Sequence, residues 1–245
     1  MSSTKIRPQQ NRPQKGDHRV SSSRPGLPGG RRDENRKART EALGKAALAL
    51  FLERGIEAVT IDEIARSAGV AKGSFYRYFD DKAALVAWLV DPVARQMRDA
   101  FARTEARLSA AKDRAGAYTA YQELALALVP LAIFHFDVVR LYLQESRAPS
   151  RGARAPIAAL VQTVDEGSVR LSQVAVDHGL VAVDDPRITA FATVGAIEQL
   201  AMSVLRGRLD ASPPEIVSTL IRMILDGVGT RATAAKDAAK DGGTA

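Results

Sequence analysis

Apolar residues recur every three or four positions along most of the chain from Thr40 onward, which is the spacing of amphipathic α-helices. The most informative stretch begins at Thr60, a residue type that favours helix N-caps, and Glu63 follows at the capping-box spacing. Gly69 ends this short helix, because glycine readily adopts the left-handed conformation needed there. A second helix is predicted from Val70. The pattern therefore indicates two short helices joined by a tight glycine turn.

The two sides of the predicted second helix differ in chemistry. Val70, Phe75 and Phe79 form its buried side. The outward positions are basic, hydroxylated or glycine: Lys72, Gly73, Ser74, Tyr76, Arg77 and Tyr78. Two helices that cross on a tight turn, with hydrogen-bond donors on the outer face of the second, are typical of a helix-turn-helix. A helical hairpin in an ordinary core is the alternative, and it explains the apolar positions but not the outer face.

The rest of the chain has helical patterns and no strand pattern. A first helix is predicted over 40–54, with its ordered start near 33–36. The later predicted helices cover 80–110, 118–134, 137–144, 156–178, 185–205 and 215–228. Pro92 is expected to kink or break its helix and Pro130 to bend its own. The predicted fold class is all-α, with an N-terminal three-helix helix-turn-helix domain, a C-terminal helical bundle and about nine helices.

Shifts in composition set the predicted domain boundaries. Residues 1–34 are rich in Pro, Gly, Ser, Arg and Gln, which predicts a disordered basic arm. The helix-turn-helix domain is assigned to 35–82 and the C-terminal helical domain to 83–230. Residues 231–245 are mostly Ala, Lys, Asp and Gly, and we expect a flexible tail.

The positive charge of the chain is concentrated at its beginning. The formal net charge is +7, but residues 1–39 hold 11 Lys/Arg against 3 Asp/Glu and the remainder holds 24 against 25. A basic arm beside a DNA-binding unit would add phosphate attraction that weakens with salt. The alternative, a tail that is merely soluble, is left open by the sequence.

Composition excludes several functional classes. The chain has no Cys and 3 His, His18, His135 and His178, so thiol chemistry is excluded and a metal site is not expected. No apolar signal segment begins the chain, and the longest apolar run, 124–134, is too short to span a bilayer. We therefore expect a cytoplasmic protein without membrane contact. A P-loop, a dinucleotide fingerprint, HExxH and G-x-S-x-G are all lacking, so no enzyme or cofactor is predicted.

The run from Leu43 to Leu85 resembles the DNA-binding domain of the tetracycline-repressor-like (TetR/AcrR) transcriptional regulators. The matching positions are Ala46-Ala47, Phe51, Gly55, Thr60-Ile61, Ile64-Ala65, Ala68-Gly69-Val70, Gly73-Ser74-Phe75-Tyr76, Tyr78-Phe79, Lys82 and Leu85. The resemblance covers about forty-five residues, and it implies an all-helical DNA-binding protein. The remaining helices are similar to the family only in number, in length and in the Asp185-Pro186 start of the penultimate helix.

The resemblance implies DNA contacts on and around the second helix of the helix-turn-helix. The residues placed at or near DNA are Thr60, Lys72, Gly73, Ser74, Tyr76, Arg77, Tyr78 and Lys82. Lys72 and Arg77 can reach guanine acceptors, so we expect base contacts from them. Tyr76, Tyr78 and Lys82 are expected to position the protein on phosphates. Thr60 can cap its helix and offer its hydroxyl and amide to a phosphate, while Tyr78 has the alternative of packing on the first helix.

The resemblance also implies a small-molecule pocket between the middle helices and a homodimer. The candidate effector residues are Tyr118, Tyr121, Phe134, His135 and Tyr142, for each of which an ordinary core position is the alternative. The candidate dimer residues are Gly195, Ala201, Ile221 and Leu225, which also suit packing within one chain.

These observations favour a ligand-responsive, sequence-specific DNA-binding regulator. The expected form is a homodimeric repressor on a palindromic operator, released by a small hydrophobic effector acting through the helix of Trp88 and Pro92. The alternative is a nucleoid-associated or architectural DNA-binding protein with little sequence preference.

Overall fold

The computed structural model describes residues 31–212, 214–223 and 225, and in this part of the chain every regular element is helical. The elements in order are α1 (Arg31–Arg54), α2 (Ile61–Ser67), α3 (Lys72–Phe75), α4 (Lys82–Ala110), α5 (Arg114–Phe134), α6 (Phe136–Glu145), the 3-10 helix η1 (Gly152–Arg154), α7 (Ala155–Asp177) and α8 (Pro186–Leu205). Residues 214–223 form a further helix. The predicted all-α fold is confirmed.

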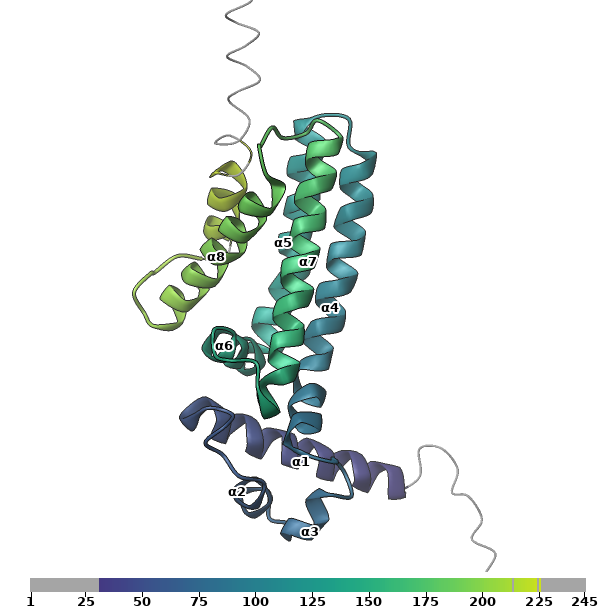
Figure 1. Ribbon diagram of the computed structural model, residues 1–245, viewed down its shortest axis with the longest axis vertical. Helices are drawn as coiled ribbons and strands as arrows, with labels where there is room; N and C mark the ends of the chain where they lie inside the picture. The colour runs from purple at the N-terminus through teal and green to yellow at the C-terminus, as the bar shows by residue number, and fades with distance from the viewer. Residues whose placement is uncertain (1–30, 213, 224, 226–245) are drawn as a thin grey trace, which may run out of the picture.

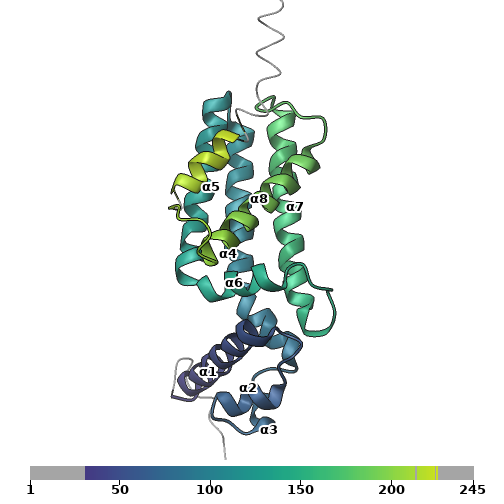
Figure 2. The ribbon, with the colours of Figure 1, turned by 90° about the vertical axis from the view of Figure 1, so that its left-hand side faces the viewer.

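The helices form two parts that meet end to end. Figure 1 shows α1, α2 and α3 at one end, with α4, α5 and α7 rising from them as a long bundle. Helix α6 lies across the base of this bundle, between it and α1 (Figure 2). Helix α8 packs on α7 near its start and diverges from the bundle towards its C-terminal end (Figure 1).

Helix α4 belongs to both parts of the molecule. Asp81 caps its N-terminus, since the Asp81 Oδ1 accepts from the Ala84 amide at 2.7 Å. Of the two outcomes predicted at Pro92, a kink or a break, the break does not occur, because α4 continues as one helix from Lys82 to Ala110. A proline removes one backbone donor, and buried Leu89 and Val93 hold the helix on either side of it.

The hydrophobic core has two clusters. The first runs from α1 through the helix-turn-helix unit into α4, α6 and α7, with Phe51, Phe75 and Leu141 among its fully buried members. The second fills the far end of the bundle around Phe101 and Leu108. Because the first cluster crosses the predicted boundary at residue 82, the two parts share one apolar core.

The longest packed seam of the bundle depends on the absence of one side chain. Helices α4 and α7 lie against each other, and a Cβ atom built on Gly167 would be 2.3 Å from the Phe101 Cδ2. No real Cβ makes such a contact, so only glycine allows the Phe101 ring to approach α7 this closely.

Two predicted boundaries differ from the structure. Helix α1 begins at Arg31, so residues 31–34 are helical and do not belong to the predicted disordered arm. The second helix of the helix-turn-helix is shorter than predicted, because only Lys72–Phe75 is α-helical and residues 76–78 form a turn. The rest of the predicted arm and the predicted tail, 231–245, lie outside the described residues.

Candidate nucleic-acid interface

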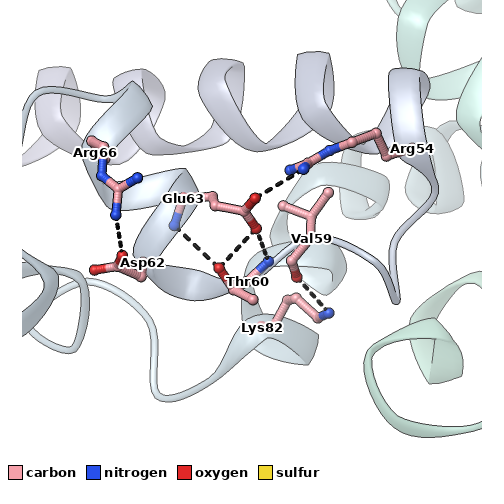
Figure 3. A network of polar contacts seen from close by, with 7 residues as sticks. All are labelled: Arg54, Val59, Thr60, Asp62, Glu63, Arg66 and Lys82. Carbon is pink, nitrogen blue, oxygen red and sulfur yellow. Dashed lines mark hydrogen bonds and ion pairs between the residues drawn. The ribbon is translucent and has the colours of Figure 1, made fainter.

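Helix α2 begins with the predicted capping box, shown in Figure 3. The Thr60 Oγ1 accepts from the Glu63 amide at 3.3 Å, and the Glu63 Oε2 accepts from the Thr60 amide at 2.8 Å. The Arg54 Nη1 donates to the Glu63 Oε1 at 2.8 Å, which ties the end of α1 to α2. Hydrogen bonds from Arg54 and Thr60 lower the pKa of Glu63 to about 2. Glu63 is therefore ionised at neutral pH, and the cap is intact.

The capping box changes the role expected of Thr60. Its amide and its hydroxyl both donate to the Glu63 Oε2, each at 2.8 Å. The sequence analysis expected these two donors to bind a phosphate, but in the structure they donate to the Glu63 carboxylate. In this structure Thr60 caps α2, and its contact with a phosphate stays a prediction.

The turn between α2 and α3 has the hydrogen bonds of a Schellman motif. The Val70 amide donates to the Ala65 carbonyl at 2.9 Å, and the Gly69 amide donates to the Arg66 carbonyl at 3.1 Å. Gly69 has φ +67°, the left-handed conformation expected from the sequence. This turn sets the angle at which α3 leaves α2.

Phe75 anchors α3 in the core. It is fully buried, and its ring centroid lies 5.7 Å from Phe79, whose ring lies 5.9 Å from Trp88 on α4. These aromatic contacts fix the rotation of α3 about its axis. The opposite side of α3 is consequently turned to solvent.

The residues predicted to contact DNA divide into two groups. Lys72, Gly73, Tyr76 and Arg77 are exposed on and just after α3, while Ser74 and Tyr78 are half-buried. Tyr78 packs against the first core cluster, as its alternative reading proposed. The Arg77 guanidinium lies 5.7 Å from the centroid of the Tyr78 ring, within range of a cation–π contact. The exposed group therefore presents the cations of Lys72 and Arg77, the phenol of Tyr76 and the backbone of Gly73 on one surface.

Lys82 has a different role from the one predicted. Its Nζ donates to the carbonyls of Ile56 at 2.7 Å, Val59 at 2.8 Å and Glu57 at 3.3 Å, and the Val59 contact is visible in Figure 3. An ammonium group has three donors, and all three point to the loop between α1 and α2. Burial lowers the pKa of Lys82. This lysine therefore fastens the start of α4 to the α1–α2 loop, which we define as residues 55–60.

Gly73 provides a direct test of close approach to a ligand. A Cβ atom built there meets no heavy atom within 4 Å, so Gly73→Ala introduces no clash. We expect the variant to keep its stability or gain about 0.5–1 kcal/mol, because alanine favours a helix over glycine. If the α3 backbone lies against DNA, the added methyl will weaken DNA binding severalfold in a fluorescence-anisotropy titration. Ser109→Ala, an exposed change at the far end of α4, should alter neither quantity; unchanged DNA binding by Gly73→Ala would contradict the close approach.

The five predicted effector residues do not gather at one place. Tyr118 and Tyr121 pack against the second core cluster, and burial raises the pKa of Tyr121 to about 12. Tyr142 belongs to the first cluster. Phe134 is 78% exposed at the end of α5, and His135 lies at the break between α5 and α6. The prediction that these residues line one pocket is therefore not supported.

The structure shows three carboxylates, at least partly buried, that the sequence analysis did not single out: Glu145, Asp165 and Glu198. The Tyr142 hydroxyl donates to the Glu198 Oε1 of α8 at 2.7 Å, and both burial and this bond raise the pKa of Tyr142. Burial and the nearby Glu198 raise the pKa of Asp165 on α7. Glu145 is buried on α6 beside Arg154. The sequence contains a signal for Glu145, because this carboxylate lies one turn after Leu141 on the apolar side of α6.

The predicted dimer residues also separate. Ile221 and Leu225 are 5% and 3% exposed and belong to the second core cluster, so they pack within the chain, which is the alternative that the sequence left open. Gly195 and Ala201 are half-buried on α8. They are six residues apart, which places them about 120° from each other around a helix, so they do not share one face.

The geometry defines a class of protein. A short helix with an exposed basic and tyrosine-bearing side, held on a capped helix by a tight turn and braced by α1, is a helix-turn-helix DNA-binding unit. Residues 43–89 match the family described as bacterial regulatory proteins, tetR family. The resemblance of the helix-turn-helix domain to this family is confirmed over these residues.

Known proteins resemble this chain either over the helix-turn-helix domain or in overall fold. The Transposon Tn10 TetC protein of Escherichia coli is 45% identical over 53 residues, which are 22% of this chain and 27% of that protein. The chain thus spans about a quarter of the length of such curated relatives. NalD of Pseudomonas aeruginosa, the secondary repressor of the MexAB-OprM multidrug efflux pump, has a similar fold, with TM-score 0.60 and 24% identity over 80% of this chain and 98% of that one. AibR, solved with isovaleryl coenzyme A and operator DNA, has TM-score 0.55 and 18% identity over 76% and 98%.

Proposed function

We propose that the protein is a sequence-specific transcriptional repressor that binds a palindromic operator as a homodimer and is released by a small hydrophobic effector. The observation that carries this proposal is the exposed group Lys72, Gly73, Tyr76 and Arg77, held on a rigid short helix by buried Phe75. Lys72 makes no ion pair with any residue that the structure describes, so its ammonium is available to DNA. Arginine and lysine favour guanine N7 and O6 in the major groove.

The proposed dimer is supported by the surface of α8. This helix has one buried residue, Ala190, although it is apolar enough and long enough to resemble a membrane span. Ile188 and Phe191 are 69% and 52% exposed on it. Large exposed apolar patches usually mark interaction sites, and a second copy supplies a partner of the same chemistry. Two copies would present two α3 helices to successive turns of DNA.

The proposed effector site is supported by the chemistry of the C-terminal domain. Most of the exposed large apolar side chains of the described residues lie on α5, α6 and α8: Leu126, Ile133, Phe134, Phe136, Ile188, Phe191, Ile197 and Val204. The Tyr142–Glu198 pair places polar groups between α6 and α8, and Asp165 of α7 is close enough to Glu198 for its pKa to be raised. Apolar walls with few polar anchors suit a hydrophobic or amphipathic ligand. The efflux-pump repressor NalD and the acyl-coenzyme A complex of AibR make such effectors reasonable probes.

Release from DNA follows from linkage. An effector that binds better to a conformation with displaced α3 helices lowers the DNA affinity by that difference in binding free energy. The reverse must also hold, so operator DNA must weaken effector binding by the same factor. Simultaneous binding of both ligands without mutual effect would contradict this part of the proposal.

Selection of bound duplexes from a random DNA pool tests the proposed function. We expect an enriched palindromic sequence with half-site centres about one helical turn apart or somewhat more. Titrations of this sequence against scrambled DNA at physiological salt should then show a preference of at least about a thousandfold. Equal binding of both DNAs would instead support an architectural role with little sequence preference.

The dimer is tested by a charge placed on α8. Phe191→Glu would bury a carboxylate in the proposed interface, at a cost of several kcal/mol. We expect light scattering to show a monomer and the operator affinity to fall at least about tenfold, since one helix-turn-helix unit makes half of the contacts. Thr119→Glu, an exposed change on α5, is the matched control. A Phe191→Glu protein that remains dimeric would exclude this face.

A further inference from the structure

A buried carboxylate joins the two parts of the molecule. Glu145, the last residue of α6, is 5% exposed. Its Oε1 accepts from the Ile56 amide of the α1–α2 loop at 3.2 Å, and its Oε2 pairs with the Arg154 Nε of η1 at 2.5 Å. Beside it, the Gln144 Nε2 donates to the Phe51 carbonyl at the end of α1 at 3.3 Å. One side chain thus connects the loop that precedes α2 with two elements of the C-terminal domain.

Two glycines allow the α1–α2 loop and the C-terminal domain to approach each other closely at this contact. Gly55 has φ +82°, and a Cβ atom on it would be 3.0 Å from the Glu145 Oε1. Gly152 of η1 has φ +54°, and a Cβ atom on it would be 3.3 Å from the Glu57 Oε1. Each glycine has a left-handed conformation and also leaves room for a group across the contact. The two surfaces therefore fit closely along the loop.

The α1–α2 loop is held from two directions. Lys82 of α4 binds the carbonyls of Ile56, Glu57 and Val59, while Glu145 binds the amide of Ile56. The loop leads directly into Thr60, the cap of α2. Any displacement of the loop would therefore move α2 and, through the glycine turn, α3.

Stability alone does not explain a buried ion pair at this place. Removing two charges from water costs about as much as their attraction returns, and an apolar pair of similar volume is often as stable. An ion pair with further hydrogen bonds does, however, define orientation, because its partners must meet at fixed distances and angles. Glu145 and Arg154 have these properties, with the Ile56 amide as the third partner.

Helix α6 is attached at the same time to α8. Tyr142 lies one turn before Glu145, and its hydroxyl donates to the Glu198 Oε1 at 2.7 Å. Arg147, just after α6, lies 3.5 Å from the Glu198 Oε2. A change in the position of α8 would therefore be transmitted along the short helix α6 to Glu145.

We propose that Glu145 is a positioning residue that sets the orientation of the helix-turn-helix unit against the C-terminal domain, so that α6 acts on α3 together with α4. The structural half of this proposal is independent of the proposed function. Its consequence for DNA binding rests on the proposed function.

Spin-label distances test the structural half. The chain has no Cys, so Ser67→Cys on α2 and Glu166→Cys on α7, both exposed, give two unique labelling sites. Labelled protein diluted into an excess of unlabelled protein reports the distance within one chain. The variants are Glu145→Ala, which removes both contacts, and Glu145→Gln, which keeps an oxygen for the Ile56 amide but loses the charge that pairs with Arg154. Glu123→Gln, which breaks the exposed Arg107–Glu123 ion pair, is the control.

We expect the distance distribution to broaden most in Glu145→Ala, less in Glu145→Gln and not in Glu123→Gln. Thermal unfolding confirms that each variant folds, and Glu145→Gln remains informative if Glu145→Ala does not. A distribution that is unchanged in every folded Glu145 variant overturns the proposal.

Operator titrations test the functional half. If a tenth of the Glu145→Ala molecules have the competent orientation, the apparent Kd rises about tenfold. The salt dependence of the Kd should stay as in the wild type, because the competent molecules make the same phosphate contacts. A reduced salt slope, or an unchanged Kd despite broadened distances, overturns the positioning role. A wild-type protein without sequence-specific binding would refute the proposed function and leave the distance test valid.

Discussion

Replacement of Phe75 by alanine is expected to lower the free energy of unfolding by about 4 kcal/mol, the largest effect of any single substitution considered for this protein. The Phe75 ring is fully buried and lies against Phe79 and Tyr76, with centroid distances of 5.7 and 5.6 Å. α3 has four residues and no side-chain N-cap bond. A helix this short has little stability of its own, so the Phe75 contacts determine whether it forms.

Trp88 fluorescence allows this loss of stability to be measured close to the helix-turn-helix unit. It is the single tryptophan of the chain, and its ring lies 5.9 Å from Phe79. Denaturant unfolding followed by Trp88 fluorescence will therefore report on the helix-turn-helix unit. Phe134→Ala removes an equal volume from a ring that is 78% exposed, and it should change stability by less than about 0.5 kcal/mol. Equal effects of the two substitutions would show that Phe75 does not anchor α3.

Lys82→Ala is expected to destabilise the protein by about 2 kcal/mol, because hydrogen bonds from a charged donor contribute about 1.5–3 kcal/mol. The substitution leaves the carbonyls of Ile56 and Val59, both partly buried in these contacts, without their donor. It also frees the start of α4 from the α1–α2 loop. We therefore expect lower stability and, through the misplaced loop, weaker DNA binding.

Lys72→Ala is the informative comparison, since Lys72 is exposed and forms no contact of this kind. It should leave stability within about 0.5 kcal/mol. Its loss should relax the preference at one operator position if Lys72 reads a base, or lower the salt slope by about one if it contacts a phosphate. Lys45→Ala, exposed on α1, controls for loss of a positive charge. If Lys82→Ala instead keeps full stability and lowers the salt slope, the phosphate role predicted from the sequence is restored.

Several local features follow from residue type and spacing alone. The Thr60 cap with Glu63, the left-handed Gly69 and the Asp81 cap of α4 depend on neighbours within a few residues in the sequence. Pro186 at the start of α8 belongs to the same group. Interactions of this range need no knowledge of the fold, and the structure agrees with the predictions made at Thr60, Glu63 and Gly69.

The hydrogen-bond partners of exposed or charged residues could not be predicted from residue type and spacing. Lys82 binds carbonyls more than twenty residues away, and Glu145 binds the Ile56 amide across 89 positions. A lysine that follows a helix-turn-helix gives the same sequence pattern whether it contacts a phosphate or a carbonyl. Similarly, the periodicity of Ile221 and Leu225 indicated a buried face, but it did not distinguish burial within the chain from burial against a second copy.

The sequence by itself determined the helical class, both ends of the first helix of the helix-turn-helix and the outward side of α3, because these depend on periodicity, capping and turn chemistry over short distances. Only the tertiary structure decided which donors remain available for DNA. Lys82 loses its donors to the α1–α2 loop, whereas Lys72 and Arg77 stay exposed. The physical reason is that a hydrogen-bonding group is satisfied by whichever partner the folded chain places within about 3 Å, and that partner is selected by the packing of distant segments.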